Sequence, residues 1–220
     1  MDDAPTNFGF LTDPHRTAVL VVDVQNLFVG FPLHPPVEEV LPRLRRFVDA
    51  ARAAGALIVR IEVVIPDAMY SEVWQRQYGP TTFLAPGSEA ATFAPGFAPE
   101  PGDVVITKPR YSAFIGTPLE TVLRSRDIRS VIVGGLTTDV CVSSTARDAF
   151  QRDFTTITLR DCAAEQTRAR HESGLATLAS AFGTVCDSSD VVRAWTAQPS
   201  PCCGVSPRAC WRKDAARDVR

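Results

Sequence analysis

The sequence predicts one α/β domain, a doubly wound, Rossmann-like six-stranded parallel sheet with helices on both faces. Three observations lead to this fold class. Short apolar runs alternate with segments whose apolar residues recur at helical spacing, which is typical of a parallel sheet with helical crossovers. The chain has 220 residues, of which 45% are hydrophobic, enough for one well-buried domain and short for two. Reactive residues also stand where several of the apolar runs end.

Six apolar runs are expected to form the strands. They are short and rich in β-branched residues, as buried strands of parallel sheets are. They cover residues 18–23, 57–63, 103–107, 130–134, 155–160 and 183–186.

Four helices are expected between these strands. The first runs from Pro36 to Ala54 and ends at Gly55, and its apolar residues recur at helical spacing. The second starts near Thr117-Pro118, because proline suits the first turn of a helix. The expected helices cover residues 36–54, 117–126, 138–152 and 167–182.

The interval from about Ile65 to Gly102 breaks the alternation of strands and helices. It contains six prolines, several glycines and aromatic residues such as Trp74. A structureless loop of this length inside a compact domain is usually functional. Two interpretations stay open: a lid or binding loop, or an excursion whose aromatic side chains cover the edge of the sheet.

The two ends of the chain fall outside the alternating pattern. We expect residues 1–16 to form an N-terminal extension, residues 17–196 to form the domain, and residues 197–220 to form a C-terminal extension or disordered tail.

Composition excludes several classes of function. The formal net charge is −2 and the isoelectric point is near 5.9, so no basic surface for nucleic acid is expected. No apolar run reaches the roughly 20 residues of a membrane helix, and the N-terminus lacks the positive region of a signal peptide. We therefore expect a cytoplasmic protein that binds neither nucleic acid nor membrane.

The six cysteines are scattered, and with no signal peptide they are expected to be free thiols. There is no Cys-x-x-Cys pair, and the tail carries only Cys202 and Cys203 with Cys210 further on. Zinc ligands stand at short, regular spacings. No metal or other cofactor is therefore expected.

Three reactive residues are predicted to meet at one edge of the sheet. Asp23, Lys108 and Cys141 each stand at or just after the end of a predicted strand. Parallel α/β sheets build their active sites at the carboxyl ends of their strands. Taken singly, each residue has an ordinary explanation: a turn or cap for the aspartate, a solvated surface lysine, and a buried structural thiol.

Together, the three side chains suit nucleophilic catalysis. A cysteine attacks as the thiolate, whereas a free thiol with a pKa of about 8.5 is mostly protonated at neutral pH. A helix start and the Lys108 ammonium would lower the thiol pKa, and Asp23 could accept the thiol proton and return it to a leaving nitrogen. The small residues at 134–138 would let backbone N–H groups stabilise an oxyanion.

Three blocks of sequence resemble the signatures of the isochorismatase-like cysteine hydrolases. They are residues 21–26 (VVDVQN), 107–114 (TKPRYSAF) and 135–150 (GLTTDVCVSSTARDAF). The resemblance covers about residues 17–195, with the blocks in the order and spacing of the family.

This resemblance implies a catalytic triad of Asp23, Lys108 and Cys141 on a six-stranded parallel sheet. It also implies a cis peptide between Leu136 and Thr137, with the backbone N–H groups of Thr137 and Cys141 as oxyanion donors. Proteins of this family are commonly homodimers or homotetramers, so the same is expected here.

Two departures narrow the activity that the resemblance implies. Nicotinamidases carry an Asp-x-His-x-x-His metal site after the second strand, where this chain has residues 62–67 (EVVIPD), and its three histidines, His15, His34 and His171, are too scattered to replace that site. True isochorismatases lack the cysteine nucleophile. What remains resembles the ureidoacrylate, biuret and N-carbamoyl amidohydrolases, which implies C–N cleavage of a small ureido, carbamoyl or amide substrate through a thioester with release of ammonia. The alternative within the family is an isochorismatase-type vinyl ether hydrolase or a nicotinamidase-like deamidase.

Residues that flank Asp23 and Lys108 are candidates to line the substrate pocket, because strand-end loops supply the polar groups of such pockets. Arg110 could bind a substrate carboxylate bidentately, or it could be solvated or paired within the protein. For the other candidates the alternative is packing or a turn. The candidates are Gln25, Asn26, Phe28, Arg110, Tyr111 and Phe114.

Other classes of protein stay open at this point. A nucleotide binder would suit the fold, but the sequence has neither Gly-x-Gly-x-x-Gly nor a P-loop. An α/β-hydrolase would need Gly-x-Ser-x-Gly. A thiol redox protein would need a second cysteine near Cys141, for which Cys162 is the nearest in sequence. A non-catalytic binding protein would have no reason to keep all three reactive groups.

Overall fold

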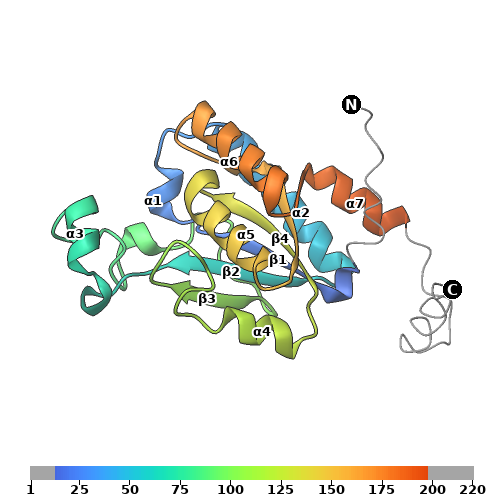
Figure 1. Cartoon of the computed structure of the whole chain (residues 1–220), viewed down its shortest axis with the longest axis horizontal. Helices are drawn as coiled ribbons and strands as arrows, with labels where there is room; N and C mark the ends of the chain where they lie inside the picture. Colours follow the sequence, from blue (N-terminus) through green and yellow to red (C-terminus); the bar gives the residue numbers. More distant parts are fainter. Residues whose placement is uncertain (1–12, 198–220) are drawn as a thin grey trace, which may run out of the picture.

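The computed structural model of the chain describes residues 13–197 and shows a six-stranded sheet flanked by helices (Figure 1). Every neighbouring pair of strands is parallel, so the predicted fold class is confirmed. Most of the expected N-terminal extension and the expected tail from residue 198, with its three cysteines, lie outside the described residues.

The chain enters the sheet in the middle and builds it outward in both directions. The order of the strands across the sheet is β3-β2-β1-β4-β5-β6. The direction of winding reverses between β1 and β4, and open α/β sheets bind ligands beyond the carboxyl ends of the strands at such a point. The strands are β1 (Thr17–Val22), β2 (Leu57–Val63), β3 (Val104–Lys108), β4 (Ser130–Leu136), β5 (Thr155–Ala164) and β6 (Thr184–Cys186).

Helices cover both faces of the sheet. Helices α2 and α7 pack against one face, and α4, α5 and α6 pack against the other. The helices are α1 (Asn26–Val29), α2 (Val37–Ala54), α3 (Glu72–Tyr78), α4 (Leu119–Ser125), α5 (Ser143–Phe150), α6 (Arg168–Ala181) and α7 (Ser188–Ala197), with a short 3-10 helix η2 (Pro14–Arg16) before β1.

The core follows the two-residue period of the strands. All of β1 is buried, and its side chains alternate between the two layers: Leu20 packs with α4, α5 and α6, while Val19 and Val21 pack with α2 and α7. On the second face Phe47 of α2 stacks on Trp195 of α7, with ring centroids 5.8 Å apart. This burial on both faces explains why the strands read as continuous apolar runs.

Two strands run at least two residues further than expected. β4 continues to Leu136 instead of 134, and β5 continues to Ala164 instead of 160. A register shift between Val133 and Gly135 in the β4–β5 pairing accompanies this extension, since a bulge lets both strands continue while the local twist increases. Because β5 ends at Ala164, the residues that follow it at the edge of the sheet are Glu165 and Gln166, which the sequence analysis did not consider for the site.

Outside the interval 65–102, the helices differ from expectation in three places. The helix expected from about residue 138 begins as a single π-helical turn, η5 (Thr138–Val142), and only then becomes α5. Helix α7 was not expected. Neither was α1, whose four residues are too few to show a helical period.

The interval 65–102 is not structureless, so that expectation was wrong. It contains η3 (Asp67–Met69), α3 and η4 (Glu89–Ala91). The part around α3 projects beyond the sheet (Figure 1), whereas Ala94 and Phe97 pack into the core beside α2. The second part therefore packs on the α2 face of the sheet, whereas the second interpretation expected aromatic side chains at the sheet edge.

No helix between residues 13 and 197 has both the length and the apolar character needed to cross a membrane.

Candidate active site

The three predicted catalytic residues come together at the carboxyl edge of the sheet. Asp23 follows β1, Lys108 ends β3, and Cys141 lies in η5 directly after β4. The Lys108 Nζ donates a hydrogen bond to Asp23 Oδ2 at 2.7 Å and another to the backbone oxygen of Arg110 at 3.0 Å. Both charged side chains are fully buried, so the pair forms an internal ion pair beside the thiol.

The backbone turns sharply at Asp23. Its φ of 51° lies in the left-handed region, which aspartate tolerates better than most residues. The Asp23 N–H donates to the Ile61 oxygen at 2.9 Å, and the Gln25 N–H donates to the Asp23 oxygen at 2.8 Å. These bonds fix the backbone of Asp23 at the carboxyl end of β1.

Asp23 has one carboxylate oxygen that is available to the thiol. Oδ2 accepts from Lys108, whereas the buried Oδ1 has no hydrogen-bond partner among the described residues. Burial raises the pKa of the Asp23 carboxyl, while Lys108 and the nearby Cys141 thiol oppose that rise. An unpartnered, buried carboxylate oxygen next to a thiol is a suitable acceptor for its proton.

The electrostatics of Cys141 differ from the sequence-based expectation of a lowered thiol pKa. Burial raises the pKa of Cys141 above its ordinary value, Lys108 lowers it and Asp23 raises it. Burial prevails because a thiolate out of water lacks solvation. Burial would also lower the pKa of Lys108, but the negative charge of the Asp23 carboxylate opposes burial and raises that pKa. These shifts favour a neutral Cys141 thiol beside the Lys108–Asp23 ion pair.

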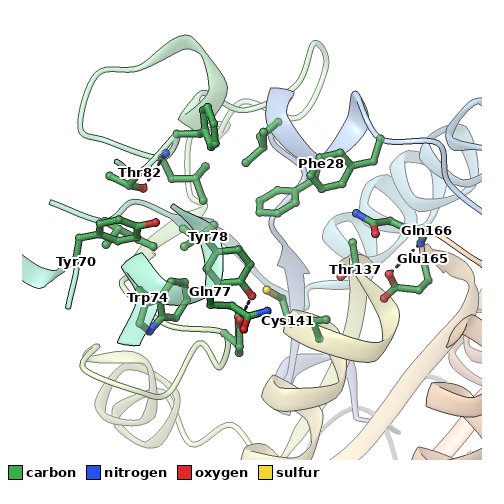
Figure 2. Close-up of a pocket in the computed structure, with 18 of the residues that line it drawn as sticks. Phe28, Tyr70, Trp74, Gln77, Tyr78, Thr82, Thr137, Cys141, Glu165 and Gln166 are labelled. Atoms are coloured by element: carbon green, nitrogen blue, oxygen red, sulfur yellow. Dashed lines mark hydrogen bonds between the residues drawn. The ribbon is translucent and has the colours of Figure 1, made fainter. Parts of the chain in front are cut away.

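A cavity of about 590 Å³ opens above Cys141. Cys141 forms part of its floor, with Asp23 and Lys108 buried behind it. In the view of Figure 2, Cys141 lies between Trp74 and Tyr78 on one side and Thr137 and Glu165 on the other. A molecule in this cavity would meet the sulfur directly.

The two predicted oxyanion residues also border the cavity. Thr137 and Cys141 both line it, and the Leu136–Thr137 peptide is cis, as the resemblance implies. The Thr137 oxygen accepts from the N–H groups of Val140 and Val142 at 3.2 and 3.1 Å, which ties the end of β4 to the turn that carries the cysteine.

One wall of the cavity is aromatic and comes largely from the interval 65–102. The ring of Trp74 lies 5.4 Å from Tyr78 and 5.1 Å from Tyr111, centroid to centroid, and the hydroxyl groups of Tyr78 and Tyr111 are hydrogen-bonded. The Arg110 guanidinium lies over Trp74 at 5.3 Å. The part of the interval around α3 thus borders the cavity, as the binding-loop interpretation held.

The opposite end of the cavity is polar. Glu165, Gln166 and Arg170 line it. The buried Glu165 carboxylate accepts from the Asp139 and Gln166 N–H groups at 3.0 and 2.9 Å and pairs with Arg170 at 3.3 Å. The sequence analysis missed these residues because it ended β5 at residue 160. With β5 ending at Ala164, the rule that strand ends carry sites would have selected Glu165 and Gln166.

Of the six predicted pocket residues, the structure places two in the cavity lining, Phe28 and Tyr111. Gln25 instead exchanges hydrogen bonds with the Val63 backbone and donates to the Ala91 oxygen. Asn26 donates to the Glu89 oxygen and to Thr92 Oγ1. The amides of these two residues therefore hold the η4 segment against the sheet.

The remaining two candidates also lie outside the lining. Phe114 is buried in the core and packs against Phe154, with centroids 6.1 Å apart. The Arg110 guanidinium donates to the backbone oxygens of Pro109 and Met69 at 2.7 and 3.3 Å, so it supports the α3 segment from outside the cavity. Arg110 and Phe114 follow Lys108 closely in sequence, but closeness in sequence does not show in which direction the loop points its side chains.

Two other residues singled out in the sequence have structural positions. Cys162 packs on the α2 and α7 face of the sheet, whereas Cys141 packs on the opposite face, so the sheet separates the thiols that a redox pair would need. His171 is buried, and its Nδ1 is hydrogen-bonded to Thr138 Oγ1 at 2.8 Å. Within residues 13–197 no group of three or more potential ligands could hold a metal ion.

Comparison with known proteins shows the family of the chain. A family model described as the Isochorismatase domain matches residues 17–190. A ureidoacrylate amidohydrolase, RutB, from Methylobacterium radiotolerans is 34% identical over 80% of this chain and 78% of its own length.

Solved structures share the fold. A cysteine hydrolase from Pseudomonas syringae pv. phaseolicola superposes with a TM-score of 0.78 at 29% identity, over 84% of this chain and 94% of that chain. N-carbamoylsarcosine amidase from Thermoplasma acidophilum gives 0.68 at 27% identity, over 79% and 96%. With the family match over most of its length, the chain belongs to the isochorismatase family.

Proposed function

We propose that the chain is a cysteine-dependent amidohydrolase in which Cys141 attacks the carbonyl carbon of a ureido, carbamoyl or amide substrate. The observation that carries this proposal is the buried Lys108–Asp23 ion pair with its unpartnered Asp23 Oδ1, set behind a thiol that faces a cavity. The broader class does not depend on that detail: the family and its named relatives make the chain a hydrolase of C–N bonds other than peptide bonds.

The first half of the reaction forms a covalent intermediate. As the Cys141 Sγ adds to the carbonyl carbon, its proton passes to Asp23 Oδ1, so no free thiolate needs to exist beforehand. The Lys108 ammonium stabilises the negative charge that develops on sulfur. Asp23 then returns the proton to the leaving nitrogen, the C–N bond breaks, and an amine or ammonia departs from a thioester.

The second half releases the acyl group. A water molecule adds to the thioester carbonyl and transfers a proton to Asp23, which passes it to the departing sulfur. A carbamoyl thioester yields carbamate, which breaks down to ammonia and carbon dioxide, and an acyl thioester yields a carboxylic acid. In both halves the N–H groups of Thr137 and Cys141 would stabilise the oxyanion, and a single such donor contributes about 3 kcal/mol.

The raised thiol pKa suits this sequence of steps. A neutral thiol is less exposed to oxidation and alkylation than a thiolate, and it becomes a strong nucleophile when its proton moves to the adjacent carboxylate. The proposal also includes a cytoplasmic homodimer or homotetramer, which the family resemblance supports.

The test is to compare ammonia release by the wild type and by Cys141→Ala on ureidoacrylate-like acids, biuret, N-carbamoyl amines and amino acids, simple amides and nicotinamide. Cleavage of isochorismate, which contains no nitrogen, is followed separately by the disappearance of the compound. The wild type should act on at least one ureide or amide far faster than on nicotinamide. It should leave isochorismate intact. Cys141→Ala should lose more than about a thousandfold in kcat/KM, as expected when a nucleophile is removed.

Two further measurements test whether Cys141, and no other cysteine, is the nucleophile. Cys162→Ala and Cys186→Ala, which change other buried thiols, should keep turnover. Rapid acid quench followed by mass spectrometry should find the acyl or carbamoyl group on the peptide that contains Cys141. Turnover by Cys141→Ala close to that of the wild type would overturn the mechanism.

A further inference from the structure

The cavity is larger and more apolar than a small ureide needs. Its volume of about 590 Å³ falls within the range of roughly 300–1,000 Å³ that is typical for drug-sized ligands. A molecule such as biuret would leave most of this space to water. Much of the lining is hydrocarbon, contributed by side chains that include Phe28, Phe31, Val63, Ile65, Trp74 and Leu84.

Aromatic side chains stand on two sides of the nucleophile. Figure 2 shows Phe28 and Trp74 on different sides of Cys141. Two contacts hold the Trp74 ring. Its centroid lies 5.1 Å from the centroid of the Tyr111 ring and 5.3 Å from the guanidinium carbon of Arg110. Phe28 meets Phe31 edge to face at 5.9 Å. These contacts keep flat apolar surfaces in place before a ligand binds, which reduces the entropy cost of binding.

The charges around the cavity are already balanced. Arg170 is the one cationic side chain in the lining of the described part of the chain, and it pairs with Glu165 at 3.3 Å and with Asp139 at 3.5 Å. The Lys108 ammonium is bound to Asp23. A carboxylate that enters the cavity would therefore meet no uncompensated cation, and burying an unpaired charge is costly.

We infer that the preferred substrate is an uncharged, N-substituted urea or amide whose substituent is an apolar group about the size of a ring. The substituent lies against Trp74 and Phe28, while the carbonyl carbon faces the Cys141 sulfur. For a urea R–NH–CO–NH₂, sulfur bonds to the carbonyl carbon and the bond to the R–NH nitrogen breaks, releasing the apolar amine. This inference rests on the proposed function and names its substrate class.

Four compounds test the size and the charge of the substituent independently. Methylurea and phenethylurea differ in apolar size, and N-carbamoylglycine and N-carbamoylphenylalanine are their counterparts with a carboxylate on the carbon next to nitrogen. Each buried methylene improves binding about fourfold, so phenethylurea should exceed methylurea at least a hundredfold in kcat/KM. The kcat/KM for N-carbamoylphenylalanine should be at least tenfold lower than that for phenethylurea.

Variants of α3 then locate the apolar contact. Trp74→Ala should lower kcat/KM for phenethylurea at least tenfold more than it lowers kcat/KM for methylurea. Val73→Ala is the matched control, because Val73 lies next to Trp74 on the same short helix but is 73% exposed and outside the cavity lining. It should change neither value by more than twofold.

Binding to Cys141→Ala, measured by isothermal titration calorimetry, separates this inference from the proposed function. Tight, Trp74-dependent binding of phenethylurea by a wild type that turns over none of the ureides and amides would support the apolar site and contradict the amidohydrolase proposal. Turnover of all four compounds at similar rates would support the amidohydrolase and overturn the inference. A preference for the carboxylated pair that Arg170→Ala abolishes would also overturn it, because Arg170 would then act as a carboxylate anchor.

Discussion

At the scale of single residues, the site depends on an ion pair that is wholly removed from water. An ammonium and a carboxylate in this position compensate each other, and both flank a thiol whose pKa burial raises. Removing one member of such a pair leaves an uncompensated buried charge. The effect on the thiol depends on which member is removed, because Lys108 lowers its pKa and Asp23 raises it.

The alkylation rate of Cys141 should report this balance. In the wild type the rate with iodoacetamide should be low at neutral pH and rise in the alkaline range, because only the thiolate reacts. Lys108→Met removes the neighbouring positive charge, so the thiol pKa should rise further and the alkylation profile should move to higher pH. The rate is measured by mass spectrometry of the peptide containing Cys141, which excludes the other cysteines.

Arg110→Ala is the control for this experiment. It removes a cation near Lys108 in sequence. That guanidinium is not part of the cavity lining and instead donates to backbone oxygens and lies over the Trp74 ring. Its alkylation profile should match the wild type. Coincident profiles for the wild type and Lys108→Met would mean that the ammonium does not act on the thiol.

At the scale of elements, the close approach of β1 and β4 positions the nucleophile. Gly135 has a φ of 127°, and a Cβ atom there would lie 2.0 Å from the Val22 backbone oxygen. The two strands meet here, one residue before Asp23 and shortly before η5. A side chain at this position would therefore push β4 away from β1 just where the acid and the thiol converge.

Gly135→Ala should accordingly destabilise the fold severely. The clash is with backbone, which cannot move aside without breaking the sheet, so a loss above about 4 kcal/mol in the free energy of unfolding is expected. Gly30→Ala is the control, because the φ of Gly30 is −77° and the nearest atoms to an added Cβ are 3.4 Å away; it should stay within about 1 kcal/mol. Soluble yield and urea unfolding measure both, and equal midpoints would refute the steric argument.

At the scale of the whole molecule, one carboxylate joins three parts of the chain. Asp103, whose side chain has no exposed surface, pairs with Arg52 of α2 and with Arg60 of β2, the latter at 2.9 Å. Burial by itself would raise the pKa of Asp103, but hydrogen bonds from the two arginines outweigh it and hold the pKa below its ordinary value. The segment before β3 is thereby fastened to the α2 side of the sheet.

This linkage should appear in the acid stability of the fold. Because the folded pKa of Asp103 is below its unfolded value of 3.8, its stabilisation is present above about pH 3.8 and is lost as the pH falls through the folded pKa. Asp103→Asn should therefore cost about 2 kcal/mol at pH 7, and the difference from the wild type should narrow below about pH 3.8. Thermal unfolding across this pH range measures it.

Glu38→Gln is the matched control for acid stability. Glu38 is exposed on α2 and makes no ion pair with another residue of the described range. It should unfold within about 0.5 kcal/mol of the wild type at every pH tested. A constant difference between Asp103→Asn and the wild type from pH 7 down to pH 2 would contradict the assigned role of the carboxylate.

The sequence by itself determined the sheet, most of its helices and the meeting of Asp23, Lys108 and Cys141. These features follow from local pattern: buried strands read as apolar runs, and parallel topology sends the ends of those runs to one edge. The isochorismatase-like blocks are likewise continuous stretches of chain. Because each of these signals lies within a few neighbouring residues, no tertiary contact was needed to read it.

Only the tertiary structure decided which side chains border the cavity and in which direction the pKa of the Cys141 thiol shifts. Trp74 and Glu165 are far from Cys141 in sequence and reach the cavity through α3 and the extended end of β5. Gln25, Asn26 and Phe114, by contrast, lie within the signature blocks, yet their side chains contact backbone or core. The thiol pKa rises because its surroundings exclude water. Burial depends on every segment that packs around a group, so it cannot be obtained from the residues next to it in the chain.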